Sequence, residues 1–233
     1  MRLNKYISET GLCSRRAADA LIEEGRVTVN GAPAALGTQV GENDEVCVDG
    51  RPLGKASAHV YLALNKPVGI ECTSAPVPSN IVDFIGYPER IFPVGRLDKA
   101  SEGLILLTNN GDIVNEILRS ENAHEKEYEV SVKQPVTEEF IEGMASGVPI
   151  LGRMTNPCKV RKTGRCTFSI VLTQGMNRQI RRMCGYFGYD VTRLKRVRII
   201  NLKLGDLKPG EWRKLSEKEV RALLPDKGPD FNF

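Results

Sequence analysis

The chain has 233 residues, enough for one large and one small domain, and 41% of them are hydrophobic, as in ordinary globular proteins. Lys and Arg outnumber Asp and Glu by 33 to 29, a balance that permits a nucleic-acid partner without requiring one. Two histidines, six scattered cysteines without a CxxC pair and the lack of a long apolar run argue against a metal site, a membrane span and a secretory leader, and favour a reduced cytoplasmic protein.

Residues 1–50 are expected to form a small domain of two helices followed by a small sheet. Leu3, Tyr6 and Ile7 share one face of a first short helix that Gly11 ends, and Ser14 is a typical N-cap for a second helix. Two stretches of alternating valines, each followed by an Asn-Gly or Asp-Gly turn, then predict strands.

Basic side chains on these two helices are candidates for a nucleic-acid-binding strip. With the neighbouring polar positions they are Arg2, Lys5, Tyr6, Ser14, Arg15 and Arg16. The alternative is an ordinary charged surface. We favour RNA binding because the acidic residues of the same segment are expected on the opposite face. They are Glu9, Asp19, Glu23 and Glu24.

A linker over residues 51–58 is expected to lead into a larger domain over residues 59–233. Apolar runs over 60–64, 91–94 and 103–108 predict buried strands, and alternation over 127–132 and 165–173 predicts half-exposed strands. Helices are expected to open at Asp112 and Thr137, to span Asn177 to Phe187, and to follow a capping box at Ser216 that closes before Pro225. Irregular alternation of strands and helices predicts a mixed α+β sheet. Cys166 and Cys184 are expected to be core thiols.

The polar segment Gly95 to Leu104 lies between two predicted buried strands, so it can present a carboxylate at the surface of the sheet. Asp98 is the candidate, because an ionised carboxylate can attack an electrophilic sugar carbon or accept a proton. The alternative is a solvated turn, and the Arg-Leu-Asp tripeptide alone does not decide between them.

A second constellation lies at the start of the helix predicted over Asn177 to Phe187. Arg178, Arg181 and Arg182 fall on one face of this helix, opposite an apolar face. Cations at a helix N-terminus need an anionic partner, which is either a phosphate backbone or a buried carboxylate such as Asp98. A solvated basic face is the alternative.

Tyr128 lies on the alternating strand 127–132, in phase with the core side of the sheet. Core packing is the default role of such a tyrosine. Beside a nucleic-acid site it can instead stack on a displaced base and exchange a proton through its hydroxyl. The residues alone leave both roles open.

Together these segments resemble the pseudouridine synthases of the small-subunit synthase A family, and the large-subunit synthase F branch matches most closely. Arg2 to Ser8 and Cys13 to Arg16 are similar to an S4 (αL-type) RNA-binding domain, and Asn65 to Gly69 is similar to the opening strand of the catalytic domain. The resemblance covers nearly the whole chain. It implies a mixed, mainly antiparallel catalytic sheet with flanking helices.

The resemblance also implies roles for individual residues. Asp98 would be the catalytic residue, Arg181 its ion-pair partner, and Tyr128 the residue that stacks on uracil and assists proton removal. Arg96 would hold or replace the flipped nucleotide. The remaining RNA contacts would come from Leu97, Lys99, Asn177, Arg178, Gln179, Ile180 and Arg182.

We therefore expect a cofactor-independent and metal-independent RNA pseudouridine synthase that isomerises a uridine in a stem-loop of large-subunit (23S) ribosomal RNA, with a tRNA anticodon uridine as a further candidate. A monomer without membrane contact is expected, and the affinity that a long basic tail gives some relatives would be missing. The alternatives are a non-catalytic S4-domain RNA-binding or ribosome-assembly factor and a nucleoside hydrolase. An acidic metal cluster, which the sequence lacks, would have favoured the hydrolase.

Overall fold

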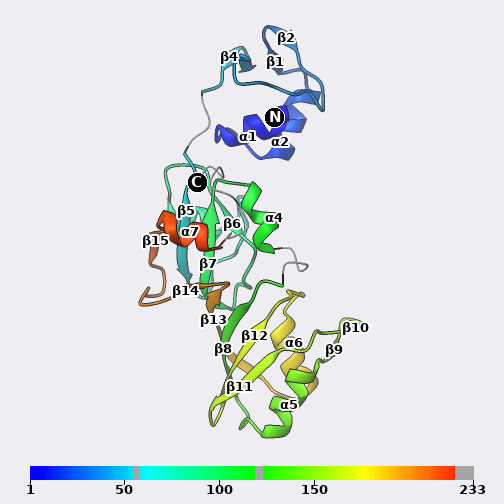
Figure 1. Ribbon diagram of the computed structural model, residues 1–233, viewed down its shortest axis with the longest axis vertical. Helices are drawn as coiled ribbons and strands as arrows, with labels where there is room; N and C mark the ends of the chain where they lie inside the picture. Colours follow the sequence, from blue (N-terminus) through cyan, green and yellow to red (C-terminus); the bar gives the residue numbers. More distant parts are fainter. Residues whose placement is uncertain (55–57, 119–122, 224–233) are drawn as a thin grey trace. The chain divides into compact units, whose positions relative to one another are not determined.

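The computed structural model describes residues 1–54, 58–118 and 123–223. The chain divides into two compact units. The smaller contains residues 1–59 and 88–90, and the larger contains residues 60–87 and 91–233 (Figure 1).

In the described part of the smaller unit, two helices are followed by a small sheet, as the sequence predicted, and this sheet has four antiparallel strands. The helices are α1 (Leu3–Glu9) and α2 (Arg15–Glu23). The strands follow the order β2-β1-β3-β4 and are β1 (Val27–Val29), β2 (Ala32–Pro33), β3 (Val46–Val48) and β4 (Arg51–Pro52). Because β4 pairs with β3, the predicted linker begins two residues too early.

Local signals in the smaller unit act as the sequence predicted. The Ser14 hydroxyl accepts a hydrogen bond from the Ala17 amide (3.1 Å) and so satisfies one free donor at the start of α2. Asn30 and Gly31 have φ values of 51° and 81°, as a tight hairpin turn between β1 and β2 requires. Apolar side chains from α1, α2 and the strands form the core of this unit.

In the described part of the larger unit, nine strands form one mixed sheet in the order β11-β12-β8-β13-β7-β5-β15, with β6 and β14 paired to β7 and β13. The strands are β5 (Tyr61–Lys66), β6 (Phe92–Val94), β7 (Glu102–Thr108), β8 (Lys126–Val132), β11 (Lys159–Gly164), β12 (Thr167–Leu172), β13 (Val191–Ile199), β14 (Leu202–Lys203) and β15 (Trp212–Lys214). A separate small hairpin contains β9 (Pro149–Ile150) and β10 (Arg153–Met154).

In residues 60–118 and 123–223, five helices flank this sheet, and four of them were expected. They are α3 (Ile81–Ile85), α4 (Asp112–Leu118), α5 (Glu138–Ser146), α6 (Gln179–Tyr186) and α7 (Glu217–Leu223). Thr137 caps α5 through the Phe140 amide (3.1 Å). Ser216 and Glu219 form the expected capping box, in which each side chain accepts from the other residue's amide. The predicted end at Pro225 lies outside the described residues.

The burial of the strands explains their sequence patterns. β5 and β7 have cores on both faces: one contains Ala63, Leu104 and residues of α4 and α7, and the other contains Leu62 and Ile105. Both strands are therefore almost continuously apolar. β8 and β12 pack one face against α5 and α6, so their apolar and polar residues alternate. The mixed α+β class is confirmed.

The junction between β7 and β13 joins the two halves of the sheet. Among the described residues this is the one parallel pairing within the sheet, and its register contains two pairs, Lys195 with Glu102 and Arg196 with Gly103. The backbones approach closely at this point. A Cβ atom on residue 103 would lie 2.2 Å from the Arg196 carbonyl oxygen, so only glycine fits there.

One of the two expected core thiols is correct. Cys184 is fully buried against α5, and burial raises the pKa of its thiol to about 12. The prediction for Cys166 is wrong, because this residue lies half-exposed between β11 and β12. No helix in the described ranges is long and apolar enough to cross a membrane.

Candidate active site

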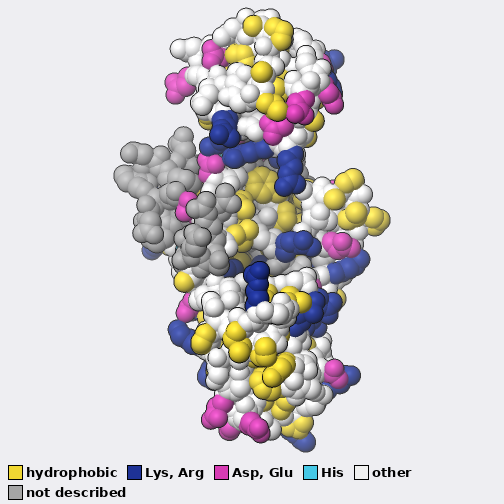
Figure 2. Space-filling model, turned by 90° about the vertical axis from the view of Figure 1, so that its right-hand side faces the viewer, with side chains coloured by type: hydrophobic (Ala, Val, Ile, Leu, Met, Phe, Trp, Pro, Cys, Tyr) yellow, Lys and Arg dark blue, Asp and Glu magenta, His cyan; other side chains and the backbone are white. Residues whose placement is uncertain are grey.

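A cavity of about 560 Å³ opens on one face of the larger sheet. Three strands supply its floor, with Leu172 from β12, Lys126 and Tyr128 from β8, and Leu194 and Arg196 from β13. The walls come from the loop that precedes β7, the end of α4 and the segment from β12 into α6. On the face of the larger unit in Figure 2, Lys and Arg side chains border a hollow with a hydrophobic floor.

Asp98 lies at this cavity because its neighbour anchors the loop. Leu97 is buried in the core beside α3, and its amide donates to the Cys72 Sγ (3.3 Å). The Ser101 amide donates to the Asp98 carbonyl (2.9 Å), which closes the loop into a turn and leaves the Asp98 carboxylate half-exposed at the cavity. Arg96 lies on the same rim. Lys99 does not line the cavity; its ammonium binds Glu71 at 2.9 Å.

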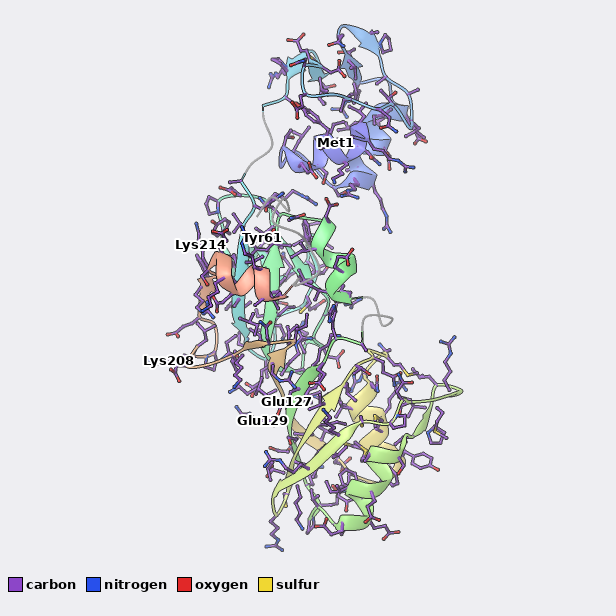
Figure 3. The ribbon with its side chains drawn as sticks, viewed as in Figure 1. Met1, Tyr61, Glu127, Glu129, Lys208 and Lys214 are labelled. Atoms are coloured by element: carbon purple, nitrogen blue, oxygen red, sulfur yellow. The ribbon has the colours of Figure 1, made fainter. Side chains whose placement is uncertain are left out.

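Tyr128 lies at the cavity floor and is half-buried against the apolar clusters on both sides of it. Its neighbours Glu127 and Glu129, labelled in Figure 3, alternate with it along β8 and therefore point to the opposite face of the sheet. Tyr128 thus packs against the core and also lines the cavity.

Arg181 does not form the expected ion pair with Asp98. No contact within 4.0 Å joins the two side chains, although both belong to the described residues. The Arg181 guanidinium instead donates to the Ala100 carbonyl (2.9 Å), the Ser101 hydroxyl (3.4 Å) and the Val191 carbonyl (3.3 Å). Burial lowers the pKa of Arg181, as does the charge of Arg178, whereas Asp98 raises it. Arg181 therefore holds the loop that carries Asp98. The charge of Asp98 also favours the charged form of Arg181, although the two side chains do not form an ion pair.

The helix α6 begins two residues later than the sequence predicted. Arg178 precedes it with φ of 51°, a left-handed conformation that cannot continue as helix, and its exposed side chain lines the cavity. Arg182 folds back to the Asn177 carbonyl (3.0 Å) and amide oxygen (3.1 Å) and stays outside the cavity. The loop thus presents Arg178 and Asn177 to a ligand.

Two further residues in this segment have structural contacts. The Gln179 amide oxygen accepts from the Met176 backbone (3.0 Å) and so fixes the loop. Ile180 is buried against the core of β8 and β12, with part of its surface at the cavity. Both residues thus make contacts within the fold that support the loop and the core.

Two basic residues of the floor, Lys126 and Arg196, were not predicted from the sequence. Lys126 lies two residues before Tyr128 on β8, and burial, followed by the charge of Arg196, lowers the pKa of its ammonium. Arg196 is 4% exposed. Its strand β13 has basic residues at 193, 195, 196 and 198, a composition typical of a solvent-exposed segment. The sequence therefore gave no indication that Arg196 is buried.

The residues expected to bind RNA in the smaller unit lie on or beside its two helices. Arg2, Arg15 and Arg16 are exposed, Tyr6 packs partly into the core, and Ser14 caps α2. The expected segregation of acidic residues is wrong in part. Glu9 lies beside Lys5 at 3.5 Å because the two are four residues apart on α1. Asp19 accepts from the Asn4 amide (2.9 Å) between the helices.

Among the described residues, no group of three or more His, Cys, Asp or Glu side chains is arranged to hold a metal ion. The polar groups that line the cavity are a carboxylate, a phenol, amides and several cations.

Residues 60–186 match the family model described as RNA pseudouridylate synthase, and residues 1–46 match the S4 domain. The chain is 57% identical to the dual-specificity RNA pseudouridine synthase RluF of Salmonella typhi over 96% of this chain and 78% of that protein. It is 34% identical to the ribosomal large subunit pseudouridine synthase B of Bacillus subtilis over 97% and 98% of the two chains. A crystal structure of a pseudouridylate synthase superposes with a TM-score of 0.71 and 30% identity, over 96% of this chain and all of that one. The resemblance to the synthase F branch is thereby confirmed, and this chain belongs to the S4-domain family of RNA pseudouridine synthases.

Proposed function

We propose that this synthase isomerises one uridine in a folded stem-loop of large-subunit ribosomal RNA, with Asp98 as the catalytic carboxylate. The observation that supports the proposal is the shared cavity, in which Asp98 and Tyr128 come together with the basic loop before α6. A volume of about 560 Å³ falls in the range of small-molecule sites and suits a single nucleotide taken out of its stack.

In this reaction, the uridine flips into the cavity and Asp98 begins the chemistry. The carboxylate either attacks C1′ of the ribose or removes the C2′ proton, and both routes break the bond between C1′ and N1. The uracil then rotates and rejoins the sugar through C5, and the C5 proton leaves. Because uridine and pseudouridine are isomers, the conversion consumes no oxidant, reductant or group donor.

The other site residues position the two reacting parts. Tyr128 would stack on the uracil at the sheet surface and assist removal of the proton. Arg181 is a positioning residue, because it holds the Ala100 carbonyl of the Asp98 loop. Arg96, Arg178 and Asn177 would contact the RNA around the flipped nucleotide, with Leu97 and Lys99 supporting the loop.

Flipping costs a few kcal/mol and is cheapest from a loop or bulge, so a folded RNA with an unpaired uridine is the expected substrate. The S4 domain would supply binding energy through the exposed cations Arg2, Arg15 and Arg16 on the neighbouring duplex, with Lys5 beside them. Because related proteins are named as dual-specificity enzymes, a tRNA anticodon uridine is the second proposed substrate. We propose a monomer that acts in the cytoplasm.

Tritium release from C5-labelled uridine tests the assignment of Asp98. Ribosomal RNA from a strain that lacks the enzyme is incubated with the wild-type protein, Asp98→Asn, and the exposed control Asp206→Asn. Wild type and control are expected to release tritium at equal rates, and Asp98→Asn at a rate at least about 1,000-fold lower. Tight, salt-sensitive RNA binding by the wild type without release from any RNA would favour the non-catalytic alternative. Release of free uracil would favour a hydrolase.

Sequencing of pseudouridines identifies the substrates. Ribosomal RNA and tRNA are compared between the strain that lacks the enzyme and the same strain with the gene restored. The proposal expects one large-subunit uridine, and a tRNA anticodon uridine, to regain the modification. Restoration only in tRNA, or only in the small subunit, would contradict the proposed substrate.

A further inference from the structure

Two hydrogen-bond donors at the cavity have no partner among the residues that the structure describes. They are Arg196 Nη2 and Gln174 Nε2, which are both buried from solvent, and both residues line the cavity. Arg196 as a whole is 4% exposed. A buried donor without an acceptor costs free energy, so two of them in one cavity indicate that a ligand supplies acceptors there.

The register of the sheet places Arg196 beside the tyrosine of the floor. Arg196 on β13 pairs directly with Tyr128 on β8, so both side chains project from the same face. A β-bulge then follows, because Arg198 pairs with Glu127. This extra residue sends Arg198 to the opposite face, where it binds Glu127 at 2.9 Å. The bulge therefore separates a structural arginine from one that faces the ligand.

Arg196 is also held in a fixed orientation. Its Nε donates to the Leu104 carbonyl on β7 at 2.7 Å, and its buried Nη2 has no acceptor in the part of the chain that the structure describes. Because the guanidinium is planar and its Nε is anchored, the direction of this free donor is set by the sheet. Such an arrangement is preorganised for an acceptor.

Positive charge accumulates around this end of the cavity. Lys126 lines the floor, and Lys66 is fully buried with its ammonium donating to the Pro67 and Ile70 carbonyls at 2.8 Å. After burial, the charge of Arg196 further lowers the pKa of both lysines. Cys72, Asp98 and Glu102 act on the pKa of Lys66 in the opposite direction. A negative charge that forms in the cavity would relieve this repulsion.

The proposed reaction forms such a charge on the base. If Asp98 attacks C1′, a C1′–oxygen bond forms and the electron pair of the C1′–N1 bond leaves with the uracil. If Asp98 instead takes the C2′ proton, the C2′–H electron pair becomes the second C1′–C2′ bond, and the same N1 pair leaves. Both routes give a uracil anion whose charge is shared by O2 and O4.

We propose that Arg196, with Gln174, binds the carbonyl oxygens of the flipped uracil, and that Arg196 stabilises the negative charge as the base detaches. This inference rests on the proposed base-flipping reaction. It makes Arg196 a catalytic residue that acts on the base, while Asp98 acts on the sugar. The deep position of Arg196 beside Tyr128 favours the base over the phosphate as its partner.

The test uses single-turnover conversion at saturating RNA, with a stem-loop that contains the mapped target uridine, 2-thiouridine or 4-thiouridine at that position. Arg196→Met is compared with wild type and with Arg198→Met, which removes an arginine from the other face of the same strand. A sulfur atom accepts hydrogen bonds poorly, so it weakens one carbonyl contact at a time. RNA dissociation constants and melting temperatures are measured for every protein.

Arg196→Met is expected to lower the rate on uridine by about 10- to 100-fold, the effect of losing one charged hydrogen bond, with RNA affinity within about threefold of wild type. For wild type and for Arg198→Met, sulfur at one of the two carbonyl positions should lower the rate below that on uridine. For Arg196→Met, the same substitution should leave the rate equal to its rate on uridine. Gln174→Leu should lower the single-turnover rate on uridine by about 2- to 10-fold. Its rate should not fall further when sulfur replaces the other carbonyl oxygen of the base. If Arg196→Met is unstable, Arg196→Lys should be slow and show the same altered thio sensitivity.

Three results would overturn the inference. Equal slowing by both thio positions in Arg196→Met and wild type would mean that no carbonyl contact exists. Weaker RNA binding with an unchanged single-turnover rate would assign Arg196 to a phosphate. A loss of rate matched by Arg198→Met would show a structural role. Conversion of the uridine RNA by the wild type tests the proposed function separately, because the inference concerns only ratios between variants.

Discussion

Replacement of Gly103 by alanine should damage both stability and activity, because this residue lies where β7 and β13 approach most closely. The added Cβ would meet the Arg196 carbonyl oxygen at 2.2 Å and its amide nitrogen at 2.6 Å. Both atoms belong to the backbone, so a side-chain rotation cannot relieve the overlap. The φ of 109° adds strain for any residue with a Cβ.

The magnitude follows from these two terms. Backbone strain of this kind costs about 1–3 kcal/mol, and overpacking of a filled interior costs about 1–3 kcal/mol. For a chain of this size, each kcal/mol lowers the melting temperature by about 2–4 °C, so Gly103→Ala should melt about 5–20 °C below wild type. Catalysis should fall as well, because Arg196 and Tyr128 lie on one side of the junction and the Asp98 loop on the other.

Calorimetry and the tritium assay measure both effects, with Gly185→Ala as the matched control. Gly185 lies near the end of α6, has ordinary φ and has no atom within 4 Å of an added Cβ, so alanine should stabilise this helix by up to about 1 kcal/mol. A Gly103→Ala protein that melts within about 1 °C of wild type and keeps full activity would refute the reasoning.

Three other substitutions test the packing, a cap and an ion pair. Phe168→Ala leaves a cavity at a fully buried position, so the free energy of unfolding of the larger unit, measured with urea, should fall by about 3–5 kcal/mol. A decrease below about 1 kcal/mol would contradict the position of Phe168 in the core. Ser14→Ala removes the cap on the Ala17 amide and should cost about 1 kcal/mol of stability in the smaller unit, whereas Ser14→Gly should cost only a few tenths. The Arg213 guanidinium lowers the pKa of Glu219 to about 2, whereas the pKa of a glutamate in the unfolded chain is about 4.3. The ion pair therefore contributes its full stabilisation at pH values above about 4.3, and this stabilisation is lost as the pH falls toward 2. Glu219→Gln should therefore melt below wild type at pH 7 and together with it near pH 2; a difference that persists at pH 2 would contradict this assignment.

Local rules predicted much of the fold. Alternation marked β8 and β12, continuous apolar runs marked β5 and β7, and Ser14, Thr137 and Ser216 marked three helix starts. These signals succeed because burial and capping act over one element at a time.

The missed elements depend on their neighbours in space. β13 contains four basic residues in nine positions and becomes a strand because it pairs with both β7 and β8. Strict alternation would also place Arg196 and Arg198 on the same face of the sheet, and the bulge between them puts the two side chains on opposite faces. The strand β11 is largely exposed and basic, and α3 has only five residues, so neither has a strong local pattern.

The candidate site was predictable to a similar extent. Asp98, Tyr128 and Arg178 were selected by residue type and phase, and the structure places them at one cavity. The contacts of Arg181 were not predictable, because they depend on where the Ala100 and Val191 carbonyls lie in three dimensions. The same holds for Arg196, whose role follows from its partner across the sheet.

The position of β13 between β7 and β8 also decides when the enzyme becomes active during its own synthesis. In the described part of the chain, β7 and β8 are neighbours only through this strand, which spans Val191–Ile199. A ribosome that has made the chain as far as α6 has already produced Asp98 and Tyr128, yet the two halves of the sheet still lack the strand that joins them. The complete cavity therefore forms late in translation, after residue 199 has left the exit tunnel.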